Sequence, residues 1–273
     1  GILLGAILNT YYHGSLDRIL CRITSLKSTL LLVAVSSILG AVSPITLFGV
    51  IPLIYSFDLS TNKKLEAAVV AFITTSMLIS PNVFVFTLSL GLDIALIRLI
   101  GTIAIGVIMG LITDIMLVSR TAFIDLNNSQ WQKEKSMCIE DKNKISTLAK
   151  NFYFAFRKTG RNLFIGIVLS YLIVFFVPAS FYDRTFISNA VAVPVSAVLS
   201  TFLYQCGGGS IPIIHGLMRE GLTTGAAITF MMVGPLTKIT NLGALGSIMP
   251  LKRLAIYISI MSVYMLTLGW LLG

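Results

Sequence analysis

The stretch FLYQCGGGSIPII, residues 202–214, places three consecutive glycines and a proline inside an apolar segment. Glycine and proline are the residues that weaken or interrupt a helix. A second stretch, SPITLFGVIPLI at residues 43–54, carries the same G-x-I-P ending. The chain therefore repeats a helix-interrupting pattern in two apolar segments, and the surroundings of these segments decide what the pattern means.

The composition indicates a membrane protein. The chain has 273 residues, of which 56% are hydrophobic and 11% charged, and its mean hydropathy is +0.91. A helix that crosses a bilayer needs about 20 apolar residues, and four runs approach this length: residues 94–117, 163–178, 190–204 and 254–272. A transmembrane barrel would instead show alternating strands. We predict an all-α polytopic membrane protein that crosses the bilayer several times.

The formal net charge of +9 has a local origin. Much of the excess lies between residues 120 and 161, and the basic loops of polytopic proteins stay in the cytoplasm, where they meet anionic lipid headgroups. We therefore interpret residues 119–160 as a cytoplasmic linker, and its closing stretch STLAKNFYFAFRKTGR suits a helix lying on the membrane surface. The expected partners are the lipid bilayer and a small solute, not nucleic acid, and a homo-oligomer is compatible with the sequence.

The sequence offers no constellation for catalysis. Its three cysteines, Cys21, Cys138 and Cys206, are too widely spaced for a metal site or an obvious disulfide framework. A phosphate-cradling loop followed by lysine is missing, so direct use of ATP by this chain is not expected. We predict a protein without enzyme activity, catalytic residues, cofactor or metal.

The two parts of the chain share a residue order. The first part has, in order, Gly49, Ile51, Pro52, Ala68, Phe72, Pro81, Gly91 and Arg98, and the second has Gly209, Ile211, Pro212, Ala226, Phe230, Pro235, Gly246 and Arg253. We infer two internal repeats, at residues 1–118 and 161–273, joined by the linker at 119–160. The apolar residues 2–12 are too few to span a bilayer, and we interpret them as the end of a truncated first span.

Each repeat contains two interrupted elements. In the first repeat they are residues 28–57, broken between Ser43 and Gly49, and residues 65–92, broken at Ser80-Pro81-Asn82. In the second they are residues 188–218, broken between Cys206 and Gly209, and residues 222–249, broken at Gly234-Pro235. Whether each element is a kinked span or a re-entrant hairpin stays open, and with it whether the repeats run parallel or inverted.

Interrupted helices at membrane depth predict a solute site between the repeats. The backbone groups that a break frees are costly in lipid, so such backbone lines a cavity or packs against protein. Half-helix N-termini also suit an anionic or electron-rich solute. Helix kinks with close packing are the alternative. The candidate binding residues are Cys206, Thr46, Gly207, Gly208, Gly209, Gly49, Asn82, Thr237, Lys238 and Asn241, and the candidate framework residues are Pro44, Pro52, Pro81, Pro212, Gly234 and Pro235.

Two of these candidates carry distinct chemistry. The thiol of Cys206 is a soft ligand for a soft electrophile or a metalloid, although a lone cysteine can equally be a small buried hydrophobe. Lys238 is an ionisable residue in an apolar segment and therefore a functional candidate, with snorkelling to the headgroups as the alternative. We expect Thr46 and Cys206 to lie close to a pseudo-twofold axis, and Lys238 to face a cavity near Thr237 and Asn241.

The second repeat, from CGGGSIP to GPLTKITNLGALGSI, resembles the bacterial predicted-permease family that includes the organoarsenical efflux permeases. The resemblance covers most of residues 28–273 outside the linker. The first-repeat pattern of that family, P-x-C-S-C-G-x-x-P, keeps its spacing here, but Thr46 and Phe48 stand in place of the two cysteines. The resemblance implies a polytopic permease that exports trivalent organoarsenicals or related compounds, with Cys206 as the remaining intramembrane thiol.

The sequence thus predicts a secondary-type efflux permease for a small thiol-reactive or organometalloid compound. One alternative is a transporter of a small anion held by Lys238 and half-helix N-termini. Another is a non-transporting membrane subunit that docks partners through residues 119–160.

Overall fold

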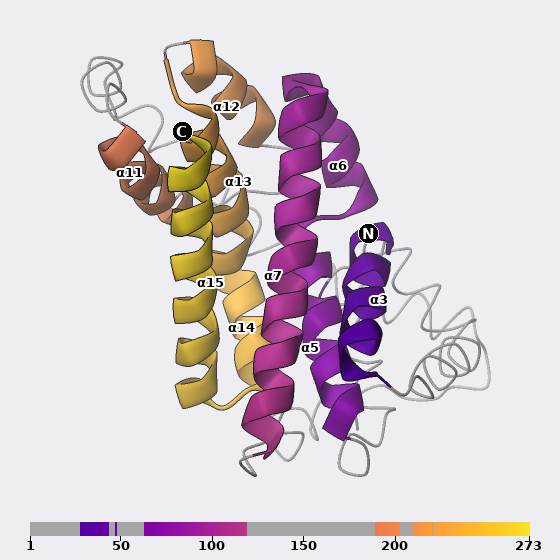
Figure 1. Cartoon of the computed structure of the whole chain (residues 1–273). Coiled ribbons are helices and arrows are strands. Elements are labelled where there is room, and N and C mark those ends of the chain that lie inside the picture. The colour runs from indigo at the N-terminus through magenta and orange to yellow at the C-terminus, as the bar shows by residue number, and fades with distance from the viewer. Residues whose placement is uncertain (1–27, 44–46, 48–62, 119–188, 203–209, 220) are drawn as a thin grey trace, which may run out of the picture.

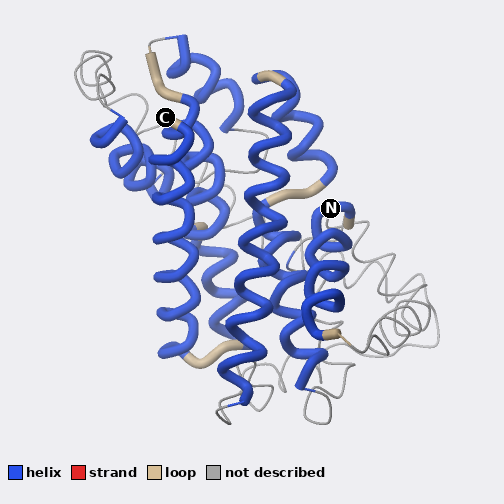
Figure 2. Tube along the Cα trace, in the orientation of Figure 1, coloured by secondary structure: helices blue, strands red, loops and turns tan. Residues whose placement is uncertain are grey.

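The computed structural model describes residues 28–43, 47, 63–118, 189–202, 210–219 and 221–273. These residues form helices joined by short connections, and no strand occurs among them (Figure 2). The predicted all-α class is therefore confirmed. The predicted span at residues 163–178, the linker at 119–160 and the apolar residues 2–12 lie outside the described residues.

Ten helical elements appear in the described part of the chain (Figure 1). Those of the first part are α3 (Thr29–Val42), α5 (Lys63–Leu78), α6 (Pro81–Thr87), the 3-10 turn η1 (Leu88–Leu90) and α7 (Leu92–Val118). Those of the second part are α11 (Asn189–Phe202), α12 (Ser210–Arg219), α13 (Thr224–Thr237), α14 (Ile239–Ile248) and α15 (Leu251–Leu272).

Local sequence explains several helix ends. Pro81 stands at the start of α6, where its missing N–H would have had no partner in any case. Gly91, with a φ of 130°, ends η1 and lets the chain turn into α7. The hydroxyl of Thr223 caps α13 by accepting a hydrogen bond of 3.3 Å from the backbone N–H of Ala226.

Two helices are long and apolar enough to cross a membrane, α7 at Leu92–Met116 and α15 at Leu251–Leu272. Among the described residues, the pair α5 and α6 adds a third candidate if the two helices form one span bent by 40°. The helices α3, α11 and α13 are apolar but shorter. The predicted spans at residues 94–117 and 254–272 are confirmed as continuous helices, and the prediction of an interrupted element at 65–92 is confirmed as well.

The helices pack as two groups. Helices α3, α5 and α7 contact one another, as do α11, α13 and α15, and α13 also contacts α5 and α7 of the first group. Glycines allow the closest contacts inside each group, as is common between membrane helices. A Cβ atom added at Gly106 of α7 would meet the hydroxyl of Thr75 on α5, and one added at Gly269 of α15 would meet the hydroxyl of Thr229 on α13.

The contact between α13 and α15 yields a first prediction. A Cβ atom at Gly225 would run into the backbone carbonyl of Gly269, which cannot move as the end of a side chain can. We expect Gly225→Ala to destabilise the protein by about 1–3 kcal/mol, the usual cost of overpacking. Gly243→Ala is the matched control, because nothing lies within 4 Å of a Cβ atom at Gly243. Thermal unfolding in detergent would measure both variants, and equal melting temperatures would contradict the prediction.

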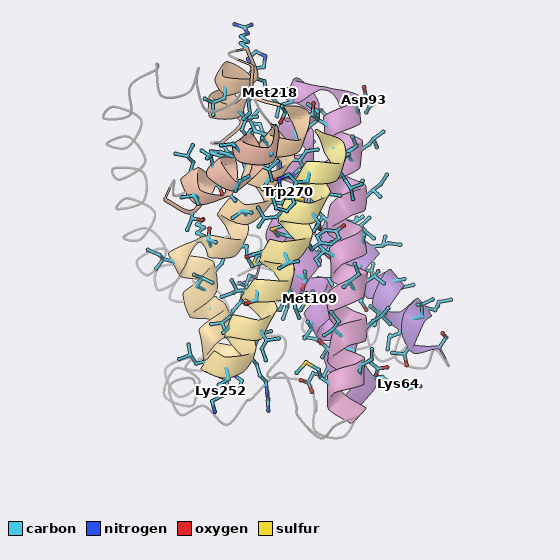
Figure 3. All side chains as sticks on the ribbon, turned by 60° about the vertical axis from the view of Figure 1, so that its left-hand side comes forward. Lys64, Asp93, Met109, Met218, Lys252 and Trp270 are labelled. Carbon is cyan, nitrogen blue, oxygen red and sulfur yellow. The ribbon has the colours of Figure 1, made fainter. Side chains whose placement is uncertain are left out.

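Helices of the two groups run in opposite directions. Lys64 at the start of α5 lies at the lower end of the molecule in Figure 3, whereas Asp93 at the start of α7 lies at the upper end. Lys252 at the start of α15 lies at the lower end, so α15 rises where α7 descends. Likewise, α5 rises toward α6, and α13 descends toward α14 (Figure 1).

Candidate functional site

The two interruptions predicted for the second element of each part have different outcomes. The break at Ser80-Pro81-Asn82 is confirmed: α5 ends at Leu78, Ser80 is extended and α6 begins at Pro81. The break predicted at Gly234-Pro235 is wrong in position. Both residues lie inside α13, which ends at Thr237, and the chain leaves the helix at Lys238 with φ −56° and ψ 123°.

The helix survives Pro235 because the proline stands in the last turn of α13. A proline there removes a single intrahelical hydrogen bond, the one that the carbonyl oxygen of Met231 would accept. The interruption three residues later frees the carbonyl of Pro235 itself, and the side-chain nitrogen of Asn241 donates a hydrogen bond of 2.7 Å to it. The side chain of Asn241 thus replaces a backbone donor at the break.

The first element predicted to be interrupted in each part is described only on either side of the predicted break. Helix α3 ends at Val42, directly before the predicted break, and Ser43 donates its N–H to the carbonyl of Leu39. Helix α11 ends at Phe202 and α12 begins at Ser210, so Pro212 lies in the first turn of α12, where proline is tolerated. The candidate residues that fall outside the described part are Pro44, Thr46, Gly49, Pro52, Cys206, Gly207, Gly208 and Gly209.

The structure brings three of the remaining candidates together. Thr237, Lys238 and Asn241 surround the interruption between α13 and α14, where the Lys238 side chain is half-buried and Asn241 is buried. The hydroxyl of Thr237 donates to the carbonyl of Val233 at 3.0 Å. Asn82 lies at the other interruption, in the first turn of α6, and its side chain is exposed.

Arg98, which the sequence indicates only as a position shared by the two parts of the chain, lies at the centre of the described part. Arg98 on α7 is 1% exposed. Its Nη2 donates to the carbonyl oxygens of Leu78 on α5 and Met231 on α13, each at 3.3 Å. Its Nη1 donates to the hydroxyl of Thr87 on α6 at 2.8 Å and to the sulfur of Met231 at 3.5 Å. One guanidinium therefore joins α5, α6, α7 and α13.

Two acceptors of Arg98 are backbone carbonyls that have no donor in their own helix. Leu78 is the last residue of α5, and Met231 is the residue whose intrahelical donor Pro235 has removed. The C-terminal end of a helix also carries a partial negative charge, which favours a cation at Leu78. Arg98 thus satisfies the interrupted end of α5 in one helix group and the carbonyl that Pro235 leaves free in α13 of the other.

The charge of Arg98 is held by neutral acceptors. Among the described residues, no carboxylate accepts a hydrogen bond from it, and its Nε is buried without a partner. An ionisable side chain inside a membrane segment marks a functional site by default. The signal was present in the sequence, because Arg98 is a charged residue inside the apolar run at 94–117.

Two further polar links join the helix groups. The hydroxyls of Tyr257 on α15 and Thr74 on α5 lie 2.9 Å apart, and both side chains are fully buried. The hydroxyl of Tyr264 on α15 donates to the carbonyl of Gly101 on α7 at 2.9 Å. The boundary between the groups is therefore polar at three places, although its surroundings are apolar.

The bond between Asn241 and Pro235 gives a second prediction. We expect Asn241→Leu to lower the free energy of unfolding by about 1–3 kcal/mol, because the buried Pro235 carbonyl loses its donor. Asn82→Leu is the control, since Asn82 is exposed at the other interruption. Thermal unfolding of the two variants in the same detergent tests the difference, and the prediction fails if Asn241→Leu is as stable as Asn82→Leu.

The apolar spans, the helix interruptions and the buried arginine define a helical membrane protein with polar chemistry at the junction of two helix groups. Comparison with known protein families agrees with this class: the model of a predicted permease family, ArsP_1, matches residues 1–273. The chain belongs to this predicted permease family. Neither a curated protein nor a solved structure matches the chain.

Proposed function

We propose that this permease is a secondary-type transporter whose solute crosses the membrane between the two helix groups. The observation that carries the proposal is that Arg98, on the boundary between the groups, bonds both to the end of α5 at its interruption and to the carbonyl that Pro235 leaves free within α13. Interrupted helices at membrane depth are the usual elements of a transporter's solute site. A charge held there by neutral acceptors can interact with an electron-rich solute.

The opposite directions of the two groups support an inverted repeat. Helices α5, α6 and α7 correspond to α13, α14 and α15 in order and in the position of the interruption, and each corresponding pair runs in opposite senses (Figure 1). Transporters built from inverted repeats place the solute site near the middle of the bilayer, between the repeats. The boundary that Arg98 occupies is the equivalent place in this chain.

The distribution of charge supports an orientation in the membrane. Lys63 and Lys64 at the start of α5, and Lys252 and Arg253 at the start of α15, belong to the lower end (Figure 3). The upper end has Arg219 as its basic residue in the described part. By the positive-inside rule the lower end faces the cytoplasm. This orientation also attaches the basic residues 119–160 to the cytoplasmic end of α7, in the inner membrane of a bacterium.

For the solute, we propose a small thiol-reactive or organometalloid compound, exported from the cell. The resemblance to organoarsenical efflux permeases and the thiol of Cys206, within the apolar stretch at residues 202–214, support this class. The test is uptake of trivalent methylated arsenicals into inverted vesicles that contain the protein, compared with vesicles that lack it. Equal uptake by vesicles with and without the protein would contradict the proposed solute class.

A small anion is the second candidate. Arg98, buried without a carboxylate among the described residues, and the half-buried Lys238 favour it. The same vesicles assayed with inorganic phosphate, arsenate and acetate test this alternative. If a folded protein moves none of the solutes in either panel, the non-transporting subunit becomes the better interpretation.

A further inference from the structure

Two of the links between the helix groups occupy corresponding positions. In the first, which we name the upper link, Arg98 of α7 reaches Met231 of α13. In the second, the lower link, Tyr257 of α15 bonds to Thr74 of α5. Each link thus joins the long helix of one group to the interrupted helix of the other.

The two linking residues stand at the same place on their helices. Arg98 lies six residues after Leu92, where α7 begins, and Tyr257 lies six residues after Leu251, where α15 begins. At about 1.5 Å per residue, each is about 9 Å along its helix from that start. Since α7 begins at the upper end and α15 at the lower end (Figure 3), Arg98 is nearer the upper face and Tyr257 nearer the lower face.

We propose that Arg98 and Tyr257 are two gate residues, one toward each face of the membrane, and that transport breaks their links in alternation. The inference rests on the proposed transport function. Both links are formed in the structure, and their four linking side chains are buried, as a state closed to both faces requires. Opening to one face separates the groups at one link while the other holds them together.

The two links differ in chemistry. The upper link is made by a charged guanidinium with more than one acceptor, whereas the lower link is a single bond between two neutral hydroxyls. Hydrogen bonds that involve an ionised group are roughly twice as strong as neutral ones. The bonds of the upper link are the longer ones, at 3.3 and 3.5 Å against 2.9 Å, so charge and distance act in opposite senses on the relative strength of the two links.

The experiment measures access to each gate from each face, and it needs no solute. Reporter cysteines are placed three residues before each gate residue, at Ala95 and Leu254, both buried; residues three apart share a helix face. The protein's own three cysteines are replaced by serine. A membrane-impermeant maleimide is added to right-side-out and to inverted vesicles, and the rate of labelling is compared among gate variants.

The expected results are specific to each gate. Arg98→Met should raise labelling of the Ala95→Cys reporter from the upper face by about ten-fold or more, the shift expected when a closed state loses a differential contact. Labelling at Leu254→Cys should not rise. Tyr257→Phe should raise labelling of the Leu254→Cys reporter from the lower face, and labelling at Ala95→Cys should not rise. Tyr264→Phe is the matched control for Tyr257→Phe, because it also removes a hydroxyl bond from α15 to the other group, but one to Gly101 of α7, away from the lower gate; it should leave the Leu254→Cys reporter unchanged.

Several results would overturn the inference. An equal response of both reporters to either gate variant would indicate general loosening of the two groups, as would a response of the Leu254→Cys reporter to Tyr264→Phe. No response in folded protein would show that the links are static. If Arg98→Met does not fold, Arg98→Lys replaces it, since one ammonium group cannot reach all the acceptors that the guanidinium joins. Selective opening in these variants, together with no flux of any solute through the protein with its natural cysteines, would sustain the gates and contradict the proposed function, so the two are tested separately.

Discussion

Replacement of Arg98 by methionine is expected to lower solute flux by about 10- to 100-fold. Hydrogen bonds to charged groups contribute about 1.5–3 kcal/mol, and about 1.4 kcal/mol corresponds to a ten-fold change in rate. The variant keeps an unbranched side chain of similar length but loses every donor. The carbonyls of Leu78 and Met231 and the hydroxyl of Thr87 then lose the donor that now joins them.

A double-mutant cycle separates this effect from general damage to the fold. Pro235→Ala restores a backbone N–H four residues after Met231, and this N–H can bond to the Met231 carbonyl within α13. Arg98→Met should therefore destabilise the Pro235→Ala protein less than it destabilises the natural one. We expect the difference to be about 1–2 kcal/mol, the range for one buried group that keeps or loses its hydrogen bond.

The measurement is chemical or thermal unfolding of the four proteins in one detergent, together with flux into inverted vesicles. Thr102→Val is the control, because Thr102 is equally buried on α7 but bonds to the backbone of its own helix, at the carbonyl of Arg98. Additive effects of Arg98→Met and Pro235→Ala would show that the guanidinium does not stand in for the missing donor. Flux at the natural level in Arg98→Met would remove this residue from the transport path.

Local chemistry made part of this fold predictable. Ser80-Pro81 fixes the start of α6, because proline restricts the residue before it and fits the first position of a helix. The same reasoning from proline placed the interruption of the second part at Gly234-Pro235, which is wrong in position. Pro235 shows only that one N–H is missing, and the sequence does not reveal that Asn241 supplies a donor to the Pro235 carbonyl and that the helix continues to Thr237.

The centre of the candidate site could not be found by reading along the chain. Arg98 and Met231 are 133 residues apart. Arg98 bonds to the Met231 carbonyl, whose donor within the helix is missing because of a third residue, Pro235. Interval matching paired Arg98 with Arg253, yet Arg98 is buried and Arg253, near the lower end, is partly exposed. The residue that corresponds to Arg98 by place on the helix is Tyr257, which has no chemical likeness to it.

The direction of the second part was equally hidden from hydropathy. Hydropathy gives the same values for a helix that rises and for one that descends, and an interrupted element can be a bent span or a hairpin. Charge bias did not decide, because Lys63 and Lys64 compete with the basic residues before residue 28. The packing of α13 against α5 and α7 settles the relative directions of the described helices, since it fixes both groups in one frame (Figure 1).

The two solute classes can be distinguished by measuring two variants with the same solute. If the solute is a soft electrophile, Cys206→Ser should abolish its flux, because a hydroxyl has nearly the size of a thiol but binds soft centres poorly. Lys238→Met should then have the smaller effect. If the solute is an anion, the order reverses: Lys238→Met should abolish binding at every pH tested, because the ammonium at the α13–α14 interruption supplies a charge that methionine lacks.

The ranking is informative only in folded protein, so each variant is compared with its own control. Cys138→Ser, in the predicted linker, controls for the loss of a thiol, and Lys252→Met, on the exposed first turn of α15, controls for the loss of a positive charge. Arg98 carries a second positive charge near the same boundary. If the solute is an anion, its flux should therefore fall less in Arg98→Lys than in Arg98→Met. Natural flux in both Cys206→Ser and Lys238→Met would exclude both residues from the solute site and leave Arg98 as the charge that the path presents.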